Sequence, residues 1–382
     1  VQITPAGGTP ILVAALDTDD QHHLAGATLD GRSLDRAWIR YRDLADRLAG
    51  QGRRVLVLDN LARPGVAANL AWLRARHGDR IQHLPADVRD EAAVREAVRG
   101  VAAVLHLAAQ VAVTTSVQDP VADFEINARG TLNLLEALRR QGGTTPLVFA
   151  STNKVYGRLL EESALERGAT RWRPKDPARR EGCDERTPLD FHSPYGCSKG
   201  VADQYVLDYA RVFGLPTLVF RMSCLYGPRQ LGSEDQGWVA HFLIRALEGR
   251  PITLYGDGRQ VRDALYVDDA VEAWLAGLAR IGEVGGRAFN LGGGPASTLS
   301  LVELLALIPD LLAAAGLGGR RPAVRHEAWR PGDQLWYVSD TAALAAATGW
   351  RRRVDLADGL ARLLAWLCER RAAAPAPEEA VA

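Results

Sequence analysis

Short apolar runs alternate with amphipathic stretches along the first part of the chain. Three of the runs are apolar at nearly every position, as is typical of parallel strands that are buried on both faces: Val55–Asp59, Ala103–Leu107 and Leu147–Ala150. The segments before or between them repeat their apolar positions with a helical period: 44–50, 90–99 and 121–141. This alternation predicts an α/β fold in which helices cover a doubly wound parallel sheet.

A longer helix is predicted to follow the third run. Ser193 is suited to cap this helix, Pro194 to occupy its first turn and Gly214 to end it. A further strand is expected at 217–221. We therefore expect a Rossmann-like lobe over 44–220 and a smaller C-terminal substrate lobe over most of 221–370. The Ala, Pro and Glu of 371–382 show no periodicity, so we expect a disordered tail there.

The composition is that of an ordinary globular protein. The 382 residues are 47% apolar and 24% charged, and 46 basic side chains balance 46 acidic ones. Zero formal net charge leaves no field to attract nucleic acid or an anionic membrane surface. The chain shows no apolar run long enough to span a membrane and no export signal, so we expect a cytoplasmic protein that acts on a small molecule.

The cysteines are scattered along the chain, without a C-x-x-C pair: Cys183, Cys197, Cys224 and Cys368. This spacing argues against a disulfide framework and against a structural zinc site. We expect free thiols and no bound metal.

The strongest chemical signal is the sequence Tyr195-Gly-Cys-Ser-Lys199 on the predicted long helix. A spacing of four residues puts the phenol and the ammonium on one helical face, where the lysine is expected to lower the pKa of the tyrosine toward neutrality. A tyrosine tuned in this way can act as a general acid and base on a sugar hydroxyl. The competing interpretation is a surface pair without a chemical role.

A second signal follows the strand at 147–150, which runs into Ser151 and Thr152. Folds of the α/β class place reacting groups at the carboxyl ends of their strands. Thr152 is therefore a candidate to hydrogen-bond the substrate oxygen whose proton Tyr195 removes. Taken alone, the same threonine is equally well explained as the cap of a turn.

Residues that follow the predicted strands indicate a dinucleotide site. Asp59 ends an apolar strand, where such folds place the carboxylate that accepts hydrogen bonds from the adenosine ribose. Because its charge would repel a 2′-phosphate, it favours NAD over NADP. Weaker candidates for contacts to the cofactor are Asn60, Asp87, Val88, Ala108, Ala109 and Gln110.

Together these positions resemble the extended short-chain dehydrogenase/reductase family, from about residue 44 to residue 367. Three segments carry the resemblance: Ser-Thr-Asn-Lys-Val-Tyr-Gly at 151–157, Asp-Phe-His-Ser-Pro-Tyr-Gly-Cys-Ser-Lys-Gly at 190–200 and Asp-Gln-Gly-Trp at 235–238. Within the family they look most like the epimerases that invert carbon 2 of a CDP-linked sugar. The resemblance implies that Thr152, Tyr195 and Lys199 are catalytic. It also implies that Asn127 supports the active-site helix, and that the protein is a homodimer.

The same resemblance implies a nucleotide-diphosphate sugar as substrate. Candidate contacts to it are Asn153, Trp238, Arg262, Arg330 and Asp333. The guanidiniums of Arg262 and Arg330 can each donate two hydrogen bonds to phosphate oxygens. Asp333 can accept a hydrogen bond from a nucleotide ribose hydroxyl. Trp238 and Phe242 would offer apolar contact to the base or the sugar, although aromatic residues at this spacing pack as often into a core.

One segment departs from the family pattern. A glycine-rich turn is needed directly before 44–48, because only bare backbone lets a diphosphate approach a helix N-terminus, but 34–43 contain no glycine. Pro10–Leu16 is a candidate first strand, although it leaves about 27 residues before the helix, far more than an ordinary strand-to-helix loop. We interpret 1–43 either as a misread version of a normal turn or as a real divergence that weakens the cofactor site.

The expected activity is epimerisation of a nucleotide-linked sugar through a transient ketone, with NAD as the hydride carrier. A nucleotide-sugar 4-epimerase is the main alternative, because the same groups serve whichever hydroxyl is presented. A 4,6-dehydratase is disfavoured, because such enzymes carry Asp-Glu directly after the catalytic threonine, and here the pair is Asn153-Lys154. A cofactor-impaired relative without activity is a further alternative.

Overall fold

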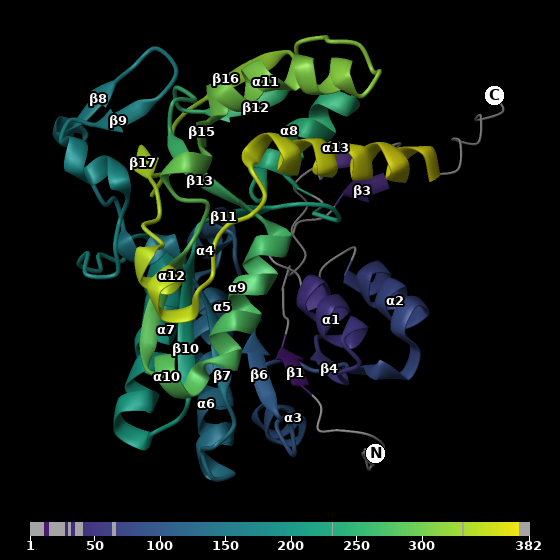
Figure 1. Ribbon diagram of the computed structural model, residues 1–382, viewed down its shortest axis with the longest axis vertical. Coiled ribbons are helices and arrows are strands. Elements are labelled where there is room, and N and C mark those ends of the chain that lie inside the picture. Colours follow the sequence, from purple (N-terminus) through teal and green to yellow (C-terminus); the bar gives the residue numbers. More distant parts are fainter. Residues whose placement is uncertain are drawn as a thin grey trace.

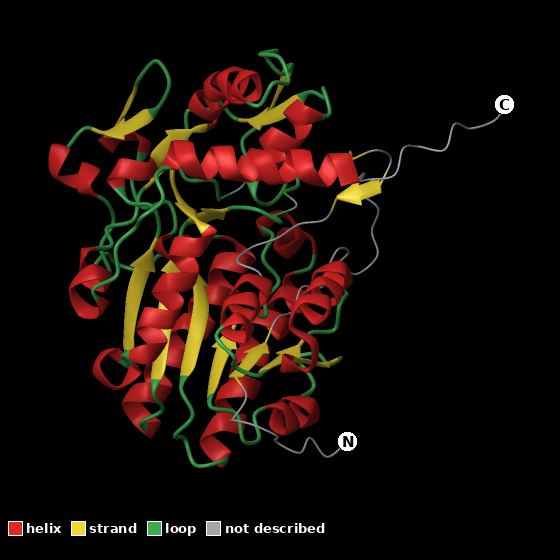
Figure 2. Ribbon diagram, turned by 45° about the vertical axis from the view of Figure 1, so that its right-hand side comes forward, coloured by secondary structure: helices red, strands yellow, loops and turns green. Residues whose placement is uncertain are grey.

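The protein forms two lobes, a larger one around a long parallel sheet and a smaller one above it (Figure 1). The computed structural model describes the residues 11–14, 27–29, 32–34, 41–62, 66–230, 232–330 and 332–373. Helices flank the strands of the large sheet on both sides, and all these strands point toward the smaller lobe (Figure 2). The carboxyl ends of the strands therefore face the space between the lobes.

The larger lobe contains seven parallel strands in the order β14-β10-β7-β6-β1-β4-β5. Their bounds are Arg287–Leu291 (β14), Thr217–Met222 (β10), Leu147–Thr152 (β7), Ala103–His106 (β6), Ile11–Ala14 (β1), Val55–Leu58 (β4) and Ile81–Leu84 (β5). The chain winds outward from β1 in both directions, so the switch point of the topology lies between β1 and β6, where α/β folds bind ligands. The predicted α/β fold with a doubly wound parallel sheet is confirmed.

Side chains of the central strands alternate between two cores. On β1, Ile11 and Val13 belong to one core, and Leu12 belongs to the other. The first core is covered by α1 (Tyr41–Gly50), α2 (Val66–His77) and α9 (Val267–Ala279). The second core is covered by α3 (Glu91–Ala97), α6 (Gly130–Arg140) and α7 (Ser193–Phe213). Burial on both faces explains why the strands read as continuous apolar runs.

The smaller lobe is built from short strands and three helices. Its main sheet has β13 between β11 and β15, with β17 also paired to β13, and two further pairs are formed by β12 with β16 and by β8 with β9. The strand bounds are Cys224–Tyr226 (β11), Val261–Tyr266 (β13), Thr298–Ser300 (β15), Trp336–Tyr337 (β17), Ile252–Tyr255 (β12), Val324–Glu327 (β16), Leu165–Arg167 (β8) and Trp172–Pro174 (β9). The helices are α8 (Trp238–Leu247), α11 (Leu301–Ala314) and α13 (Leu356–Ala373).

The segment predicted as one helix over 121–141 contains a π turn at Glu125–Arg129. This turn lies between α5 (Pro120–Phe124), whose first turn is capped by Asp119, and α6. A short helix, α4 (Val113–Gln118), precedes α5. A π turn widens the helix locally and is frequent at functional sites.

The long helix α7 ends at Gly214 as predicted, but it begins one residue earlier than expected, with His192 in the capping position and Ser193 as its first residue. The Ser193 hydroxyl accepts a hydrogen bond from the backbone N–H of Gly196 at 3.3 Å, which is the contact of a helix cap. Gly214 ends the helix with φ of 70°, a left-handed conformation that glycine adopts without strain. Among the described residues, no helix is long and apolar enough to cross a membrane.

The lobe boundaries differ from those expected. The candidate strand in Pro10–Leu16 is present as β1 at the centre of the sheet, so part of the segment 1–43 belongs to the larger lobe. Beyond residue 220, β14 and α9 return to that lobe, and α12 (Ala342–Thr348) contacts β14. Helix α13 extends through three residues of the expected tail, to Ala373, because its preceding turns are anchored in the core. Residues 374–382 lie outside the described residues.

Candidate active site

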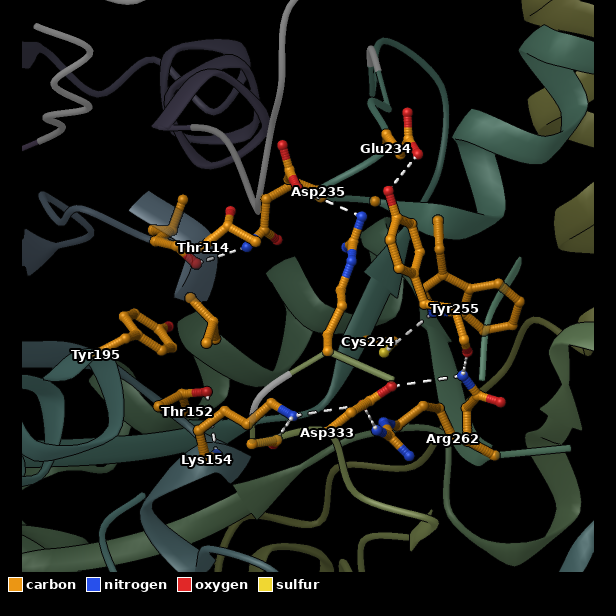
Figure 3. Close-up of a pocket in the computed structure, with 18 of the residues that line it drawn as sticks. Thr114, Thr152, Lys154, Tyr195, Cys224, Glu234, Asp235, Tyr255, Arg262 and Asp333 are labelled. Carbon is orange, nitrogen blue, oxygen red and sulfur yellow. Dashed lines mark hydrogen bonds and ion pairs between the residues drawn. The ribbon is translucent and has the colours of Figure 1, made fainter. Parts of the chain in front are cut away.

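A cavity of about 420 Å³ lies between the two lobes, beyond the carboxyl ends of β7 and β10. Residues predicted for the site line it from both lobes: Thr152, Asn153, Tyr195, Trp238, Phe242, Arg262, Arg330 and Asp333. Figure 3 shows Tyr195 and Thr152 at one side and Arg262 with Tyr255 at the other, with Lys154 and Asp333 between them. The structure thus brings the predicted catalytic hydroxyls and the predicted substrate contacts into one cavity.

Thr152 and Tyr195 come together from β7 and α7. Thr152 is the last residue of β7, and its hydroxyl oxygen accepts a hydrogen bond from the backbone N–H of Lys154 at 3.2 Å. Tyr195 lies in the first turn of α7, where its backbone N–H donates to the Ser116 hydroxyl at 3.1 Å. The side chains of Thr152 and Tyr195 interact and line the same cavity, so a single substrate oxygen can contact both.

Burial dominates the electrostatics of Tyr195 and Lys199. Burial raises the pKa of Tyr195, and the hydrogen bond with Thr152 opposes this rise. Burial lowers the pKa of Lys199 to about 7, and the carboxylates of Asp123 and Asp203 oppose that shift. Burial therefore favours the neutral phenol of Tyr195 and the neutral amine of Lys199. Thr152 acts against burial at Tyr195, and Asp123 with Asp203 acts against it at Lys199.

The expectation that Lys199 lowers the pKa of Tyr195 is wrong for this structure. The Lys199 ammonium lies over the ring of Phe149, 4.2 Å from its centroid, and interacts with Asp123 and Asp203. For the phenol, burial is the largest influence, and the charge of Asp123 adds to the rise in pKa. The spacing of four residues does place both side chains on the buried side of α7, as predicted.

Asn127 connects the loop after β6 to α7. Its side-chain oxygen accepts a hydrogen bond from the Gln110 N–H at 2.9 Å, and its amide nitrogen donates to the Gln110 carbonyl at 3.0 Å. The same nitrogen donates to the Ser198 hydroxyl at 3.0 Å. Because Ser198 lies on α7 between Tyr195 and Lys199, Asn127 contacts the helix that it is expected to support.

The predicted cofactor residues lie at the carboxyl ends of β4, β5 and β6. Asp59 follows β4 directly, and its buried carboxylate accepts a hydrogen bond from the Leu61 N–H at 2.8 Å. Burial raises the pKa of Asp59 to about 7. The Asn60 amide donates to the Asp87 carboxylate at 3.2 Å, which joins the loops after β4 and β5. The other predicted residues are buried beside these loops: Val88, Ala108, Ala109 and Gln110.

The donor and acceptor groups at these strand ends fit NAD. A buried carboxyl after the strand next to β1 is suited to accept hydrogen bonds from the adenosine ribose, and its charge disfavours a 2′-phosphate. The backbone N–H groups of Leu107 and Ala108 both donate to the Ala14 carbonyl at 2.9 Å, which holds the loop after β6 against the end of β1. The expected place of the glycine turn, between β1 and α1, falls largely outside the described residues.

Two arginines at the opposite side of the cavity are oriented by carboxylates. Arg262, on β13, donates to the Asp333 carboxylate at 2.6 Å. Arg330 forms an ion pair with Asp235 at 3.4 Å, and its guanidinium lies 3.8 Å from the centroid of the Tyr255 ring. Pairs of this kind fix the plane of a guanidinium, which prepares it to bind phosphate oxygens.

The aromatic pair Trp238 and Phe242 lies between the cavity and the hydrophobic core. Trp238 lines the cavity, and its indole N–H donates to the Cys224 sulfur at 3.4 Å. Phe242 meets the Trp238 ring edge-on, with 5.9 Å between the centroids, and belongs to the hydrophobic core. Trp238 is therefore the member of the pair with more surface available to a ligand.

The cavity is also lined by Lys154, Tyr255 and Glu234, which were not predicted as site residues. The Lys154 ammonium lies 3.9 Å from the Asp333 carboxylate and 3.4 Å from the Gly332 carbonyl oxygen. Burial, with a contribution from Arg262, lowers the pKa of Lys154 to about 8. The Tyr255 hydroxyl donates to the Glu234 carboxylate at 2.6 Å. Lys154 was detectable from its position two residues after Thr152, whereas Tyr255 and Glu234 belong to no motif.

Comparisons with known proteins agree with this geometry. A profile described as "NAD dependent epimerase/dehydratase family" matches residues 42–292. The chain is 41% identical over 331 residues to CDP-paratose 2-epimerase of Salmonella typhi, which covers 85% of this chain and 95% of that protein. It is 30% identical over 326 residues to a putative UDP-glucose 4-epimerase of Methanocaldococcus jannaschii, over 85% and 93% of the two chains.

Solved structures agree as well. The dTDP-glucose 4,6-dehydratase DesIV of Streptomyces venezuelae, with NAD and TYD bound, superposes with a TM-score of 0.73 at 27% identity, over 95% of this chain and 98% of that one. The UDP-glucose 4-epimerase of Thermus thermophilus in complex with NAD gives a TM-score of 0.71 at 31% identity, over 96% and 100%. The chain therefore belongs to the NAD dependent epimerase/dehydratase family of enzymes, and its cofactor is NAD.

Proposed function

We propose that the enzyme epimerises a nucleotide-diphosphate sugar through a transient ketone, and that this sugar is CDP-linked and inverted at carbon 2. The observation that carries the proposal is the cavity itself, which has Thr152 and Tyr195 at one side and Arg262 with Tyr255 at the other. The Arg330 guanidinium lies over the Tyr255 ring. Such a separation suits a ligand with a sugar at one end and a diphosphate at the other. The similarity to CDP-paratose 2-epimerase supports the choice of nucleotide and carbon.

The catalytic groups would act on one sugar hydroxyl. Tyr195 removes the hydroxyl proton, and Thr152 hydrogen-bonds the same oxygen. The chemistry that bound NAD would supply is reversible hydride transfer at the sugar carbon. Arg262 and Arg330 hold the diphosphate while the ketone turns in the cavity, and Tyr195 then returns its proton to the oxygen of the inverted carbon.

The residues that would hold NAD follow the strands of the larger lobe. Asp59 and Asn60 would contact the adenosine ribose, and Asp87 with Val88 would flank the adenine. Ala108, Ala109 and Gln110 would lie along the diphosphate and the second ribose, with Asn127 behind them. Tyr195 and Lys199 would contact the ribose next to the nicotinamide.

The residues after Thr152 favour epimerisation over elimination of water. Elimination beside the ketone needs an acid and a base, and Asn153 and Lys154 supply an amide and an ammonium in place of two carboxylates. Asn153 is buried, and its amide is 3.4 Å from the Gln334 side-chain oxygen. A nucleotide-sugar 4-epimerase is the alternative, because Thr152 and Tyr195 would serve a hydroxyl on carbon 4 equally well.

Isotope labelling tests the transient ketone. We expect a nucleotide sugar deuterated at the inverted carbon to give a product that keeps the label at that carbon, because the hydride returns to the molecule from which it came. In D₂O, an unlabelled substrate should give an unlabelled product. Mass spectrometry and NMR of the product measure both results, with CDP-, UDP- and dTDP-linked sugars compared. Entry of solvent deuterium at that carbon would instead show deprotonation of an acidic C–H bond.

We infer that the enzyme is a homodimer, because apolar side chains are exposed on helices that contact one another. They lie on α4, α5 and α7: Val117, Val121, Phe124, Tyr205, Val212 and Phe213. Val121→Glu should convert the dimer to a monomer, since its side chain is 71% exposed and a charge there would be buried by association. Sedimentation measures the mass, and Leu307→Glu on α11 is the matched control that should leave it unchanged. A parent chain that sediments as a monomer would contradict the inference.

A further inference from the structure

Asp123 is a fully buried carboxylate that the proposed mechanism does not use. It lies on α5, and its two oxygens accept hydrogen bonds from three side chains. The Gln110 amide donates at 2.7 Å, the Asn127 amide at 3.2 Å, and the Ser198 hydroxyl donates to the other oxygen. These donors come from the loop after β6, from the π turn and from α7, so Asp123 joins the active-site helix α7 to the loop and the π turn beside it.

All three donors to Asp123 are neutral, and this distinguishes it from the second buried carboxylate near Lys199. Asp203 is held by both arms of the Arg221 guanidinium, at 2.9 and 3.0 Å, and by the Ser151 hydroxyl at 2.7 Å. The charge of Asp203 is therefore matched by Arg221. The hydrogen bonds to Asp123 orient its carboxylate without cancelling its charge, which stays available to a nearby cation.

Lys199 is that cation. It is 2% exposed, its ammonium lies over the Phe149 ring, and Asp123 and Asp203 are the carboxylates that interact with it. The other titratable groups that face this pair are His106 from β6, Tyr195 and Cys197 from α7, and Asp119 before α5. Burial keeps His106 neutral by lowering its pKa to about 3, so it supplies no competing charge.

We propose that Asp123 is a positioning residue: it fastens α7 to the loop after β6, and it supplies the negative charge that keeps Lys199 protonated inside the protein. This inference rests on the proposed role of Tyr195 and Lys199. Burial favours the neutral form of Lys199. Without the Asp123 charge, the carboxylate left to oppose burial would be Asp203, whose charge is already matched by Arg221. Lys199 would then release its proton at a lower pH.

The chain allows a direct measurement, because its only lysines are Lys154, Lys175 and Lys199. Lysine labelled with ¹³C at Cε gives three NMR signals, which Lys154→Arg and Lys175→Arg assign by elimination. In Asp123→Asn, we expect the titration midpoint of Lys199 to fall by about one pH unit or more, while the midpoints of the other two lysines stay unchanged. An unchanged Lys199 midpoint would overturn the proposal.

Two control variants separate charge from hydrogen bonding. Asp119→Asn removes an exposed charge from the same helix and keeps its cap, since asparagine caps as well as aspartate, so the Lys199 midpoint should not move. Ser198→Ala removes a hydrogen bond to Asp123 but keeps the carboxylate, and it should move the midpoint far less than Asp123→Asn does. An equal shift in Ser198→Ala would contradict the role of the charge.

The wild-type protein provides a second test if Asp123→Asn does not fold. Burial raises the pKa of Asp123 to about 6, so its protonation should appear as a second inflection in the Lys199 signal on the acid side. A single inflection would overturn the proposal. Because these titrations use no substrate, they succeed or fail independently of the proposed epimerisation, which the isotope experiment tests.

Discussion

Replacement of Tyr195 by phenylalanine is expected to reduce turnover by about 10²–10⁴-fold. The substitution removes the oxygen that takes and returns the proton and keeps the buried ring, so the fold should be nearly unchanged. Tyr195 lines the cavity together with Thr152, and no other tyrosine of α7 lines it. Steady-state kinetics with the nucleotide sugar measures the loss, and thermal unfolding checks the fold.

The matched control for this variant is Tyr205→Phe. Tyr205 lies on the same helix but is 43% exposed and outside the cavity, so this variant should keep the activity of the parent. Titration with NAD should give similar affinities for the parent and both variants. Turnover of Tyr195→Phe within a factor of two of the parent would remove Tyr195 from the mechanism.

Exchange of residues 15–40 for a short glycine-rich turn is expected to strengthen NAD binding by roughly two to four orders of magnitude. Strand β1 ends at Ala14 and α1 begins at Tyr41, and a diphosphate must meet backbone N–H groups between them. The chain has Trp38, Ile39 and Arg40 directly before α1 instead of glycines. Two charge-assisted hydrogen bonds of about 1.5–3 kcal/mol each account for the expected gain.

Calorimetric titration of the two proteins with NAD measures this difference. The parent should purify without bound cofactor, whereas the exchanged chain should retain NAD. Asp59→Asn in the exchanged chain should weaken binding again, which places the titrated ligand at the carboxyl end of β4. Tight binding of NAD by the parent would show that another part of the chain supplies the phosphate site.

The elements that were predicted well are those whose signal is local. The apolar runs at β4, β6 and β7 are buried on both faces, and a run of this kind is visible from four or five adjacent residues. The candidate catalytic residues Thr152 and Tyr195 were visible for the same reason, because each lies at the end of one element. The cavity then confirmed that they lie in one place.

The features that were missed depend on contacts between distant segments. The burial of Asp123 is produced by Gln110 and Ser198, and nothing within its own helix marks it as buried. The pKa of Tyr195 was expected to fall because spacing indicates proximity along a helix, but spacing says nothing about how much water the fold removes. The return of β14 to the larger sheet likewise depends on pairing with β10.

That return has a consequence for how the protein reaches its native state. Strand β14 pairs along β10 from Leu218 to Met222, so the edge of the large sheet is completed only by residues that follow β11, α8, β12 and β13 of the smaller lobe. Until Arg287–Leu291 have been synthesised, β10 presents an unpaired apolar edge of the kind that joins other chains. Long-range pairing of this kind also slows folding. The two lobes are thus a single folding unit, and the larger one cut after residue 220 would aggregate rather than fold alone.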